Sequence, residues 1–183
     1  IQVDKCIGCG ECVKACHTEN DVPDDGLLTR TWVERYRIHA DQEVSVSLEK
    51  PGEPGPSDSA EEKETTRTFF VPKLCNQCEH PPCVQVCPVG ATFATEEGVV
   101  IVDNDRCLGC RYCVQACPYG ARFIHPKRQT ADKCTFCYHR LKKGLSPACV
   151  EVCPTSARIF GNLNERADLL TRFRRMNKLH RLK

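Results

Sequence analysis

The sixteen cysteines of this 183-residue chain fall into four groups of four. In every group, two residues separate the first two cysteines and three residues separate the last two. The groups are Cys6, Cys9, Cys12 and Cys16; Cys75, Cys78, Cys83 and Cys87; Cys107, Cys110, Cys113 and Cys117; and Cys134, Cys137, Cys149 and Cys153. Thiolates repeated in this way are ligands for soft metals or metal–sulfur cores, and no cysteine is left over.

Three other kinds of cysteine chemistry fit the spacing less well. A disulfide framework does not require three cysteines at intervals of three, nor a proline after the last one. Structural zinc is bound by two C-x2-C pairs or by cysteine with histidine. Haem attachment requires C-x2-C-H, whereas three residues separate Cys12 from Cys16 before His17.

The spacing C-x2-C-x2-C-x3-C-P is that of bacterial ferredoxins. There, three thiolates bind one [4Fe–4S] cluster and the fourth binds the neighbouring cluster. We therefore expect Cys107, Cys110 and Cys113 to share a cluster and Cys117 to belong to another. Two pairings are open: first group with second and third with fourth, or the second and third nested inside the first and fourth. The short connection between the second and third groups, residues 88–106, favours nesting.

The elements that must position these cysteines are short. Residues 29–38 and 43–48 alternate as strands do, and residues 98–102 predict a short strand before the third group. Residues 50–67 are rich in Pro, Gly, Ser and acidic residues and predict a surface loop or linker. The segments CPVGATF, CPYGARF and CPTSARI (87–93, 117–123 and 153–159) repeat after the fourth cysteine. In each, proline ends the local turn and a strand is expected to follow.

The end of the chain predicts a basic amphipathic helix. Leu169, Leu170, Phe173, Met176 and Leu179 recur at helical spacing among Lys and Arg. An isolated helix of this length is marginal in water, so it needs a surface on which to pack. Its own core, a partner subunit and anionic lipid are the candidates.

Composition excludes several classes of protein. The formal charge of +2 counts every cysteine as neutral, and nothing suggests nucleic acid as a partner. No apolar run is long enough to span a membrane, so we expect no transmembrane segment. No leader precedes Cys6, as in a mature chain, a fragment, or a protein made without a secretory signal.

Several residues near the cysteines have two interpretations. Lys127, Arg128 and Lys133 would offset cluster charge or belong to a solvated loop. Arg111 and Tyr112, inside a cluster loop, would tune that cluster or contact a partner.

Three further residues have ordinary interpretations. His80 either lines the second group's cluster or is a surface histidine, His17 is expected to be structural, and Trp32 is expected to pack on a strand. There is no nucleophile–base pair, Gly-rich phosphate loop or carboxylate dyad, so catalysis by this chain alone is not expected.

Four segments together resemble the iron–sulfur subunits of the dimethyl sulfoxide reductase group. They are VDKCIGCGECVKAC (3–16), LCNQCEHPPCVQVCPVGA (74–91), DRCLGCRYCVQACPYGAR (105–122) and DKCTFCYHRLKKGLSPACVEVCPTSAR (132–158). The resemblance covers residues 1–165 and implies four [4Fe–4S] clusters with nested ligation. The implied ligand sets are Cys6, Cys9, Cys12 and Cys153; Cys75, Cys78, Cys83 and Cys117; Cys107, Cys110, Cys113 and Cys87; and Cys134, Cys137, Cys149 and Cys16.

The resemblance also implies a function. Such a subunit is not itself an enzyme: it carries electrons between a molybdenum- or tungsten-pterin catalytic subunit and a quinone-linked integral-membrane subunit. We expect membrane association through these partners, with the periplasmic face favoured over the cytoplasmic. The alternatives are an iron–sulfur subunit of a molybdenum-free quinone-linked complex (of the alternative complex III or sulfite-reduction type), a free soluble polyferredoxin and, remotely, a zinc-built interaction module.

The expected fold class is α+β, with two intertwined ferredoxin-like halves, loop insertions and a C-terminal helix. Residues 1–40 and 124–163 would form the half with the first and fourth groups, and residues 68–123 the other half. Residues 41–67 would be a strand and acidic loop insertion, and residues 164–183 the basic tail.

Overall fold

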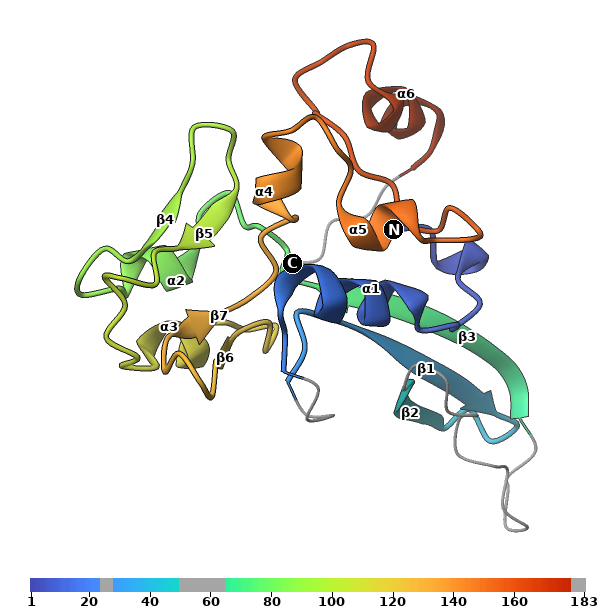
Figure 1. Ribbon diagram of the computed structural model, residues 1–183. Coiled ribbons are helices and arrows are strands. Elements are labelled where there is room, and N and C mark those ends of the chain that lie inside the picture. Colours follow the sequence, from blue (N-terminus) through green and yellow to red (C-terminus); the bar gives the residue numbers. More distant parts are fainter. Residues whose placement is uncertain (24–27, 50–64, 179–183) are drawn as a thin grey trace.

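The computed structural model describes residues 1–23, 28–49 and 65–178 and is a mixture of short helices and small sheets (Figure 1). The predicted mixed class is thereby confirmed. The helices are the 3₁₀ helix η1 (Val3–Lys5), α1 (Glu11–Asn20), α2 (Pro82–Gln85), α3 (Tyr112–Gln115), α4 (Tyr138–Leu141), α5 (Ala148–Glu151) and α6 (Leu169–Met176). The strands are β1 (Thr31–His39), β2 (Val44–Glu49), β3 (Thr65–Leu74), β4 (Thr92–Ala94), β5 (Val100–Val102), β6 (Phe123–Ile124) and β7 (Ala131–Asp132).

Four of the helices each carry the third cysteine of a group. In α2, α3 and α5 the helix is a single turn that ends two residues before the fourth cysteine. The proline after that cysteine disfavours helical backbone at the residue before it, which limits the length of the turn. The first group has His17 where the others have proline, and α1 accordingly continues to Asn20.

Strand β1 is the centre of the largest sheet, whose order is β2-β1-β3. Both pairings are antiparallel, and Val33 of β1 lies opposite Glu49 of β2 and Pro72 of β3. Pro72 lacks a backbone donor, which an edge strand tolerates. The predicted strands at 29–38 and 43–48 are confirmed as β1 and β2, whereas β3 was not predicted.

Two antiparallel hairpins complete the strand content. Strand β4 pairs with β5, which confirms the predicted strand at 98–102, and β6 pairs with β7. The predicted loop at 50–67 lies mostly outside the described residues, and its last three residues are strand rather than loop because β3 begins at Thr65.

The buried core is small and is built partly from cysteines. One cluster joins Cys12, Val13, Val33 and Cys149, from the first and fourth groups and β1. A second joins Cys83, Val100, Cys113 and Ala131, from the second and third groups with β5 and β7. In Figure 1, α2, α3 and β4–β7 lie on one side of the molecule, and α1, α5, β1 and β3 lie on the other.

The predicted division into halves differs in detail from this packing. Ala131 and Ile124 pack with the second cluster, although the predicted boundary at 123/124 assigned them to the other half.

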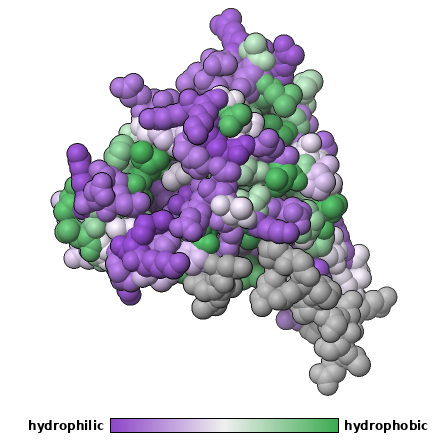
Figure 2. All heavy atoms as spheres, viewed as in Figure 1, coloured by the Kyte–Doolittle hydropathy of each residue, from purple (hydrophilic) through white to green (hydrophobic). Residues whose placement is uncertain are grey.

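Hydrophilic residues cover most of the face in Figure 2, as expected of a chain with few aromatic residues.

Helix α6 is shorter than the sequence pattern predicted. It begins after Asp168, whose Oδ1 accepts a hydrogen bond from the backbone N–H of Leu170 at 2.7 Å, an N-terminal cap. It ends at Met176, and Leu179 lies outside the described residues. Leu169 and Met176 are 69% and 78% exposed, so much of the predicted apolar stripe is not covered by this chain.

Candidate iron–sulfur sites

The four cysteine loops share one backbone turn. The residue two positions after the first cysteine has a positive φ in every group: Gly8 (72°), Gln77 (47°), Gly109 (67°) and Phe136 (52°). This left-handed conformation is unfavourable for most L-residues, so its recurrence in four loops marks a shared geometric requirement. The chain curls in the same way in each group and presents its thiols to one side.

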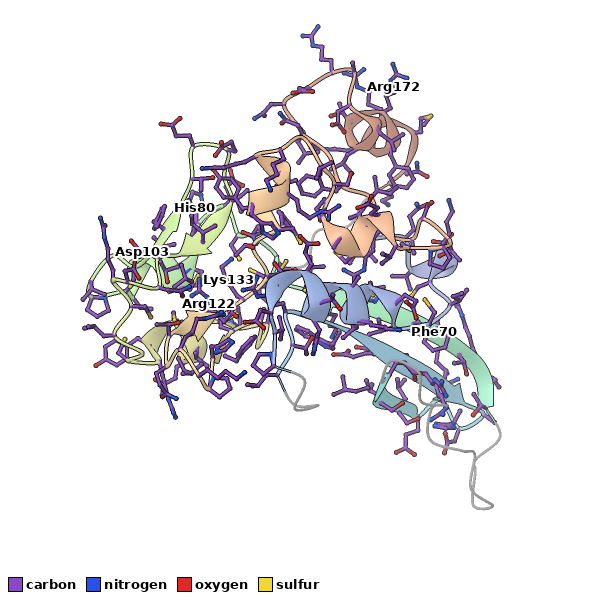
Figure 3. All side chains as sticks on the ribbon, viewed as in Figure 1. Phe70, His80, Asp103, Arg122, Lys133 and Arg172 are labelled. Carbon is purple, nitrogen blue, oxygen red and sulfur yellow. The ribbon has the colours of Figure 1, made fainter. Side chains whose placement is uncertain are left out.

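Glycine is required in the first and third loops by close approach as well as by φ. A Cβ on Gly8 would overlap the ring of Phe70 on β3, which Figure 3 labels. A Cβ on Gly109 would overlap the backbone oxygen of Gln129. The first loop therefore packs closely against Phe70, and the third loop packs closely against the backbone of Gln129.

Three small hollows of similar size lie inside the loops. Each is lined by the first three cysteines of one group and by the fourth of another. The cysteines are Cys75, Cys78, Cys83 and Cys117 in the first hollow; Cys87, Cys107, Cys110 and Cys113 in the second; and Cys6, Cys9, Cys12 and Cys153 in the third. The structure thus brings together the cysteines of three of the four predicted sets.

The remaining four cysteines, Cys16, Cys134, Cys137 and Cys149, are all buried. Burial is the main cause that raises the pKa of Cys16, and the neighbouring sulfurs of Cys134, Cys137 and Cys149 raise it further. Burial likewise raises the pKa of Cys134 to about 12. These four thiols therefore also lie together, all at buried positions.

Asn20 links sulfurs of two groups in this buried set. Its Nδ2 donates to Cys16 Sγ at 3.6 Å and to Cys137 Sγ at 3.5 Å. Its Oδ1 accepts from Arg30 Nη1 at 2.9 Å, and Arg30 in turn pairs with Asp132 at 2.7 Å. Asn20 is available for this contact because α1 extends beyond Cys16.

The arrangement suits a cluster rather than a single metal ion. All sixteen cysteines are free thiols, so none forms a disulfide. Within the described ranges, no three His, Cys, Asp or Glu side chains converge as ligands of one ion. Zinc requires its sulfur ligands about 2.3 Å from a common centre, whereas each iron of a cubane takes one thiolate at a separate corner. Thiols placed around a hollow therefore fit the cubane.

Backbone amides stabilise the thiolate of two of the fourth cysteines. Burial would raise the pKa of Cys87, but backbone hydrogen bonds from Thr92, Val89 and Ala91 outweigh it and lower the pKa. Cys153 has the corresponding arrangement: burial opposes the charge, and hydrogen bonds from the residues two, four and five positions later lower the pKa.

These backbone hydrogen bonds explain why the sequence after the fourth cysteine is similar in three groups. Proline in the next position begins the turn without supplying a donor. The residue three positions after the cysteine has a positive φ in all three repeats: Gly90 (63°), Gly120 (61°) and Ser156 (53°). The left-handed residue turns the following amides back toward the sulfur.

Two buried arginines in the same segments lie beside cysteines of two sets each. Arg122 donates to Cys83 Sγ at 3.0 Å and to Thr92 Oγ1 at 3.2 Å. Burial raises the pKa of Cys113, and the nearby Arg122 opposes that effect. Arg158 donates to Thr31 Oγ1 at 2.7 Å.

Arg158 has the matching place on the other side of the molecule. Burial raises the pKa of Cys12 and of Cys149, and the nearby Arg158 opposes that effect at both thiols. Sequence reasoning missed both arginines, although the signal was present: each stands five residues after the fourth cysteine, in CPYGAR and CPTSAR.

Lys133 is a third buried cation, with none of its surface exposed. Its Nζ donates to the backbone oxygens of Val100 and Cys134. The sequence left open whether Lys133 lies near the clusters or in a solvated loop. It is buried beside the cysteines and is not part of a solvated loop. Figure 3 shows Arg122 and Lys133 close together in the middle of the molecule.

The other candidate residues lie at the surface or pack conventionally. Lys127 and Arg128 are exposed, and Arg128 pairs with Asp132 at 3.0 Å. Arg111, Tyr112 and His80 are exposed, the first two beside Cys110.

His17 and Trp32 have the ordinary positions expected of them. His17 is half-buried on α1, and Trp32 of β1 donates to Glu34 Oε1 at 2.8 Å. Among the residues that the structure describes, no helix has both the length and the apolar character needed to cross a membrane.

Two family models match the chain, both described as 4Fe-4S dicluster domains. One matches residues 66–163 and the other residues 5–91. The second match covers the first and second cysteine groups together, which is not the nested pairing. The nested pairing of groups is therefore argued from the positions of the thiols and not from these matches.

Three named relatives are similar over nearly the whole chain. The tetrathionate reductase B subunit of Salmonella typhimurium is 47% identical over 165 residues, 90% of this chain and 57% of that protein. The tetrathionate reductase B subunit of Archaeoglobus fulgidus is 47% identical over 167 residues, 91% of this chain and 67% of that protein. The thiosulfate reductase electron transfer subunit of Salmonella typhi is 44% identical over 162 residues, 88% of this chain and 73% of that protein. The chain therefore spans little more than half of the first relative and about two thirds to three quarters of the others.

Proposed function

Because this chain belongs to the 4Fe-4S dicluster family that includes the iron–sulfur subunits of tetrathionate and thiosulfate reductases, we propose that it conducts electrons through four [4Fe–4S] clusters within a reductase complex. It is an electron-transfer subunit and not the catalytic one. The observation that carries the proposal is the convergence of cysteines from different groups around common hollows.

The ligand sets of the proposal are named after their first cysteine. The Cys6 set is completed by Cys153, the Cys75 set by Cys117, the Cys107 set by Cys87 and the Cys134 set by Cys16. Support comes from the three hollows and from the mutual interaction of the four thiols in the Cys134 set. When bound, the clusters supply one-electron redox chemistry, and the role of this chain is to hold them near one another and away from water.

Contacts between sets suggest the path of the electrons. Cys12 of the Cys6 set interacts with Cys149 of the Cys134 set. Cys134 interacts with Cys75, and Cys83 of the Cys75 set interacts with Cys113 of the Cys107 set. The sets thus follow one another in the order Cys6, Cys134, Cys75, Cys107.

The two ends of that path are the accessible ones. Cys9 of the Cys6 set and Cys110 of the Cys107 set are exposed, and the other fourteen cysteines are not. Ile7 and Leu108, at matching positions beside them, are exposed apolar residues. Electrons would enter and leave through these two ends.

The partners in this proposal are a molybdenum- or tungsten-pterin catalytic subunit and a quinone-linked membrane subunit. Support comes from the relatives, which are named as subunits of reductases rather than as free ferredoxins. Attachment to the membrane through the second partner, on the periplasmic face, stays a prediction.

The direct test is the metal content of anaerobically purified protein. Four complete clusters require about sixteen iron and about sixteen acid-labile sulfide per chain, and the absorbance at about 400 nm should bleach on reduction. Stoichiometric zinc with little iron would contradict the proposal.

A further inference from the structure

A buried arginine stands at two of the places where thiols of successive sets meet. Arg122 donates to Cys83 Sγ and lies near Cys113, and Arg158 lines the hollow of the Cys6 set and lies near Cys149. The first place is the junction of the Cys75 and Cys107 sets, and the second is the junction of the Cys6 and Cys134 sets.

The two arginine junctions are built alike. Both arginines are 5% exposed, both follow a fourth cysteine by five residues, and each is fixed by a threonine at the start of a strand. Arg122 donates to Thr92, the first residue of β4, and Arg158 donates to Thr31, the first residue of β1. Each guanidinium is thus held in place from one side, with its charge beside sulfurs of two sets.

Arg158 lines the hollow of the Cys6 set. Within the described part of the chain, Nε of Arg158 is buried without a hydrogen-bond acceptor. A buried charged donor without a partner is costly, and cluster sulfide or thiolate is the acceptor that its surroundings provide.

The electrostatic reason for such cations is general. A [4Fe–4S] cluster with four thiolates carries a net charge of roughly −2, and reduction adds another negative charge. Neighbouring clusters in a dry interior repel that electron strongly, because the field is poorly screened there. A cation held between two clusters lowers the cost of reducing either one.

We propose that Arg122 and Arg158 are charge-compensating residues that raise the reduction potentials of the two clusters flanking each junction. The inference rests on the proposed function, since it requires the clusters to be present. It assigns to these two side chains the task of making neighbouring clusters reducible within one small protein.

The test measures the potential of every cluster in the full chain. Arg122→Gln and Arg158→Gln are purified anaerobically, iron is counted, and the clusters are titrated by EPR-monitored redox titration. Signals are assigned by comparison with Cys117→Ser, which removes a ligand of the Cys75 set. Lys127→Gln is the matched control, because it removes the same charge from an exposed position.

In Arg122→Gln, reduction of the Cys75 and Cys107 clusters should become at least tenfold less favourable, a negative shift of about 59 mV for a one-electron couple. The Cys6 and Cys134 clusters should keep their potentials. Arg158→Gln should shift the potentials of the Cys6 and Cys134 clusters and leave those of the Cys75 and Cys107 clusters unchanged. Each variant therefore serves as the control of the other. Lys127→Gln should leave all four unchanged.

The conservative variants separate charge from structure. Arg122→Lys and Arg158→Lys keep the charge and should retain iron and potentials close to those of the unaltered chain. Full iron in Arg122→Gln with potentials matching Lys127→Gln would overturn the inference. If a glutamine variant loses iron, the corresponding lysine variant is measured instead. Loss of iron from the lysine variant, or a negative shift of its cluster potentials, would also overturn the inference. Absence of iron from the unaltered chain would instead overturn the proposed function.

Discussion

Asn20 donates a hydrogen bond to the sulfur of Cys137, a residue 117 positions later, at a distance of 3.5 Å. The same amide nitrogen reaches Cys16 Sγ at 3.6 Å, so one side chain bridges the first and fourth cysteine groups. An amide N–H pointing at a thiolate stabilises its negative charge, which matters most in a set that is entirely buried.

We expect Asn20→Asp to damage the Cys134 set. The substitution keeps the size of the side chain and the acceptor for Arg30, but it replaces the donor with a carboxylate facing two sulfurs. Iron content should fall by about a quarter, as one cluster of four is lost. Asn164→Asp, at an exposed position before α6, is the control and should retain full iron. Full iron in Asn20→Asp would show that the amide is not needed by the thiolates.

Cys117→Ser tests the exchange of ligands between groups. Cys117 lies in the third group but lines the hollow of Cys75, Cys78 and Cys83. We expect loss or conversion of the Cys75 cluster, with the Cys107 cluster intact. EPR and iron analysis report the result, and Cys87→Ser, which should give the opposite lesion, is the matched control. A lesion in the Cys107 cluster of Cys117→Ser would contradict the exchange.

Gly109→Ala tests the close approach in the third loop. Gly109 and Gly98 both have a positive φ, 67° and 82°, so alanine strains the backbone at either position. Only at Gly109 would the added Cβ overlap another atom, the backbone oxygen of Gln129; Gly98 has open space. We therefore expect Gly109→Ala to lose the Cys107 cluster, whereas Gly98→Ala should cost only about 1 kcal/mol in unfolding free energy and retain iron. Equal behaviour of the two variants in iron content would refute the steric explanation.

Deletion of residues 167–183 tests whether the tail belongs to this chain's core. Leu169 and Met176 are largely exposed, and Arg172 points away from the body of the protein in Figure 3. We expect the truncated chain to keep nearly full iron but to be lost from its complex, as measured by iron analysis and by co-purification. Loss of clusters on truncation would assign the helix to the core instead.

Local sequence was sufficient to predict the cysteine loops, the turn at the Cys-Pro steps and the strands β1 and β2. Each depends on residues within a few positions of one another: the first and second cysteines, the Cys-Pro step, and the alternation of residues 29–38. Strand β3 escaped prediction because its first residues continue a polar segment. It pairs with β1 across the whole intervening insertion.

The contacts that the sequence alone could not predict are long-range and specific. Asn20 reaches Cys137 only because α1 continues past Cys16, which the missing proline permits but does not require. Arg122 and Arg158 were visible as a repeat after the fourth cysteine, yet a repeated arginine does not reveal that it lies between two sets of thiols. That information comes from how the groups pack on one another.

The hollow lined by both Cys6 and Cys153 has a consequence for the order in which the sites can be completed during synthesis. A ribosome releases the chain from its N-terminus, so the earliest thiols emerge long before the cysteine that completes their site. The sites that use residues 75–117 are complete much sooner, and iron insertion can begin there. A chain truncated before Cys153 would lack the fourth thiol of the Cys6 set, whereas both middle sites would have all of their cysteines.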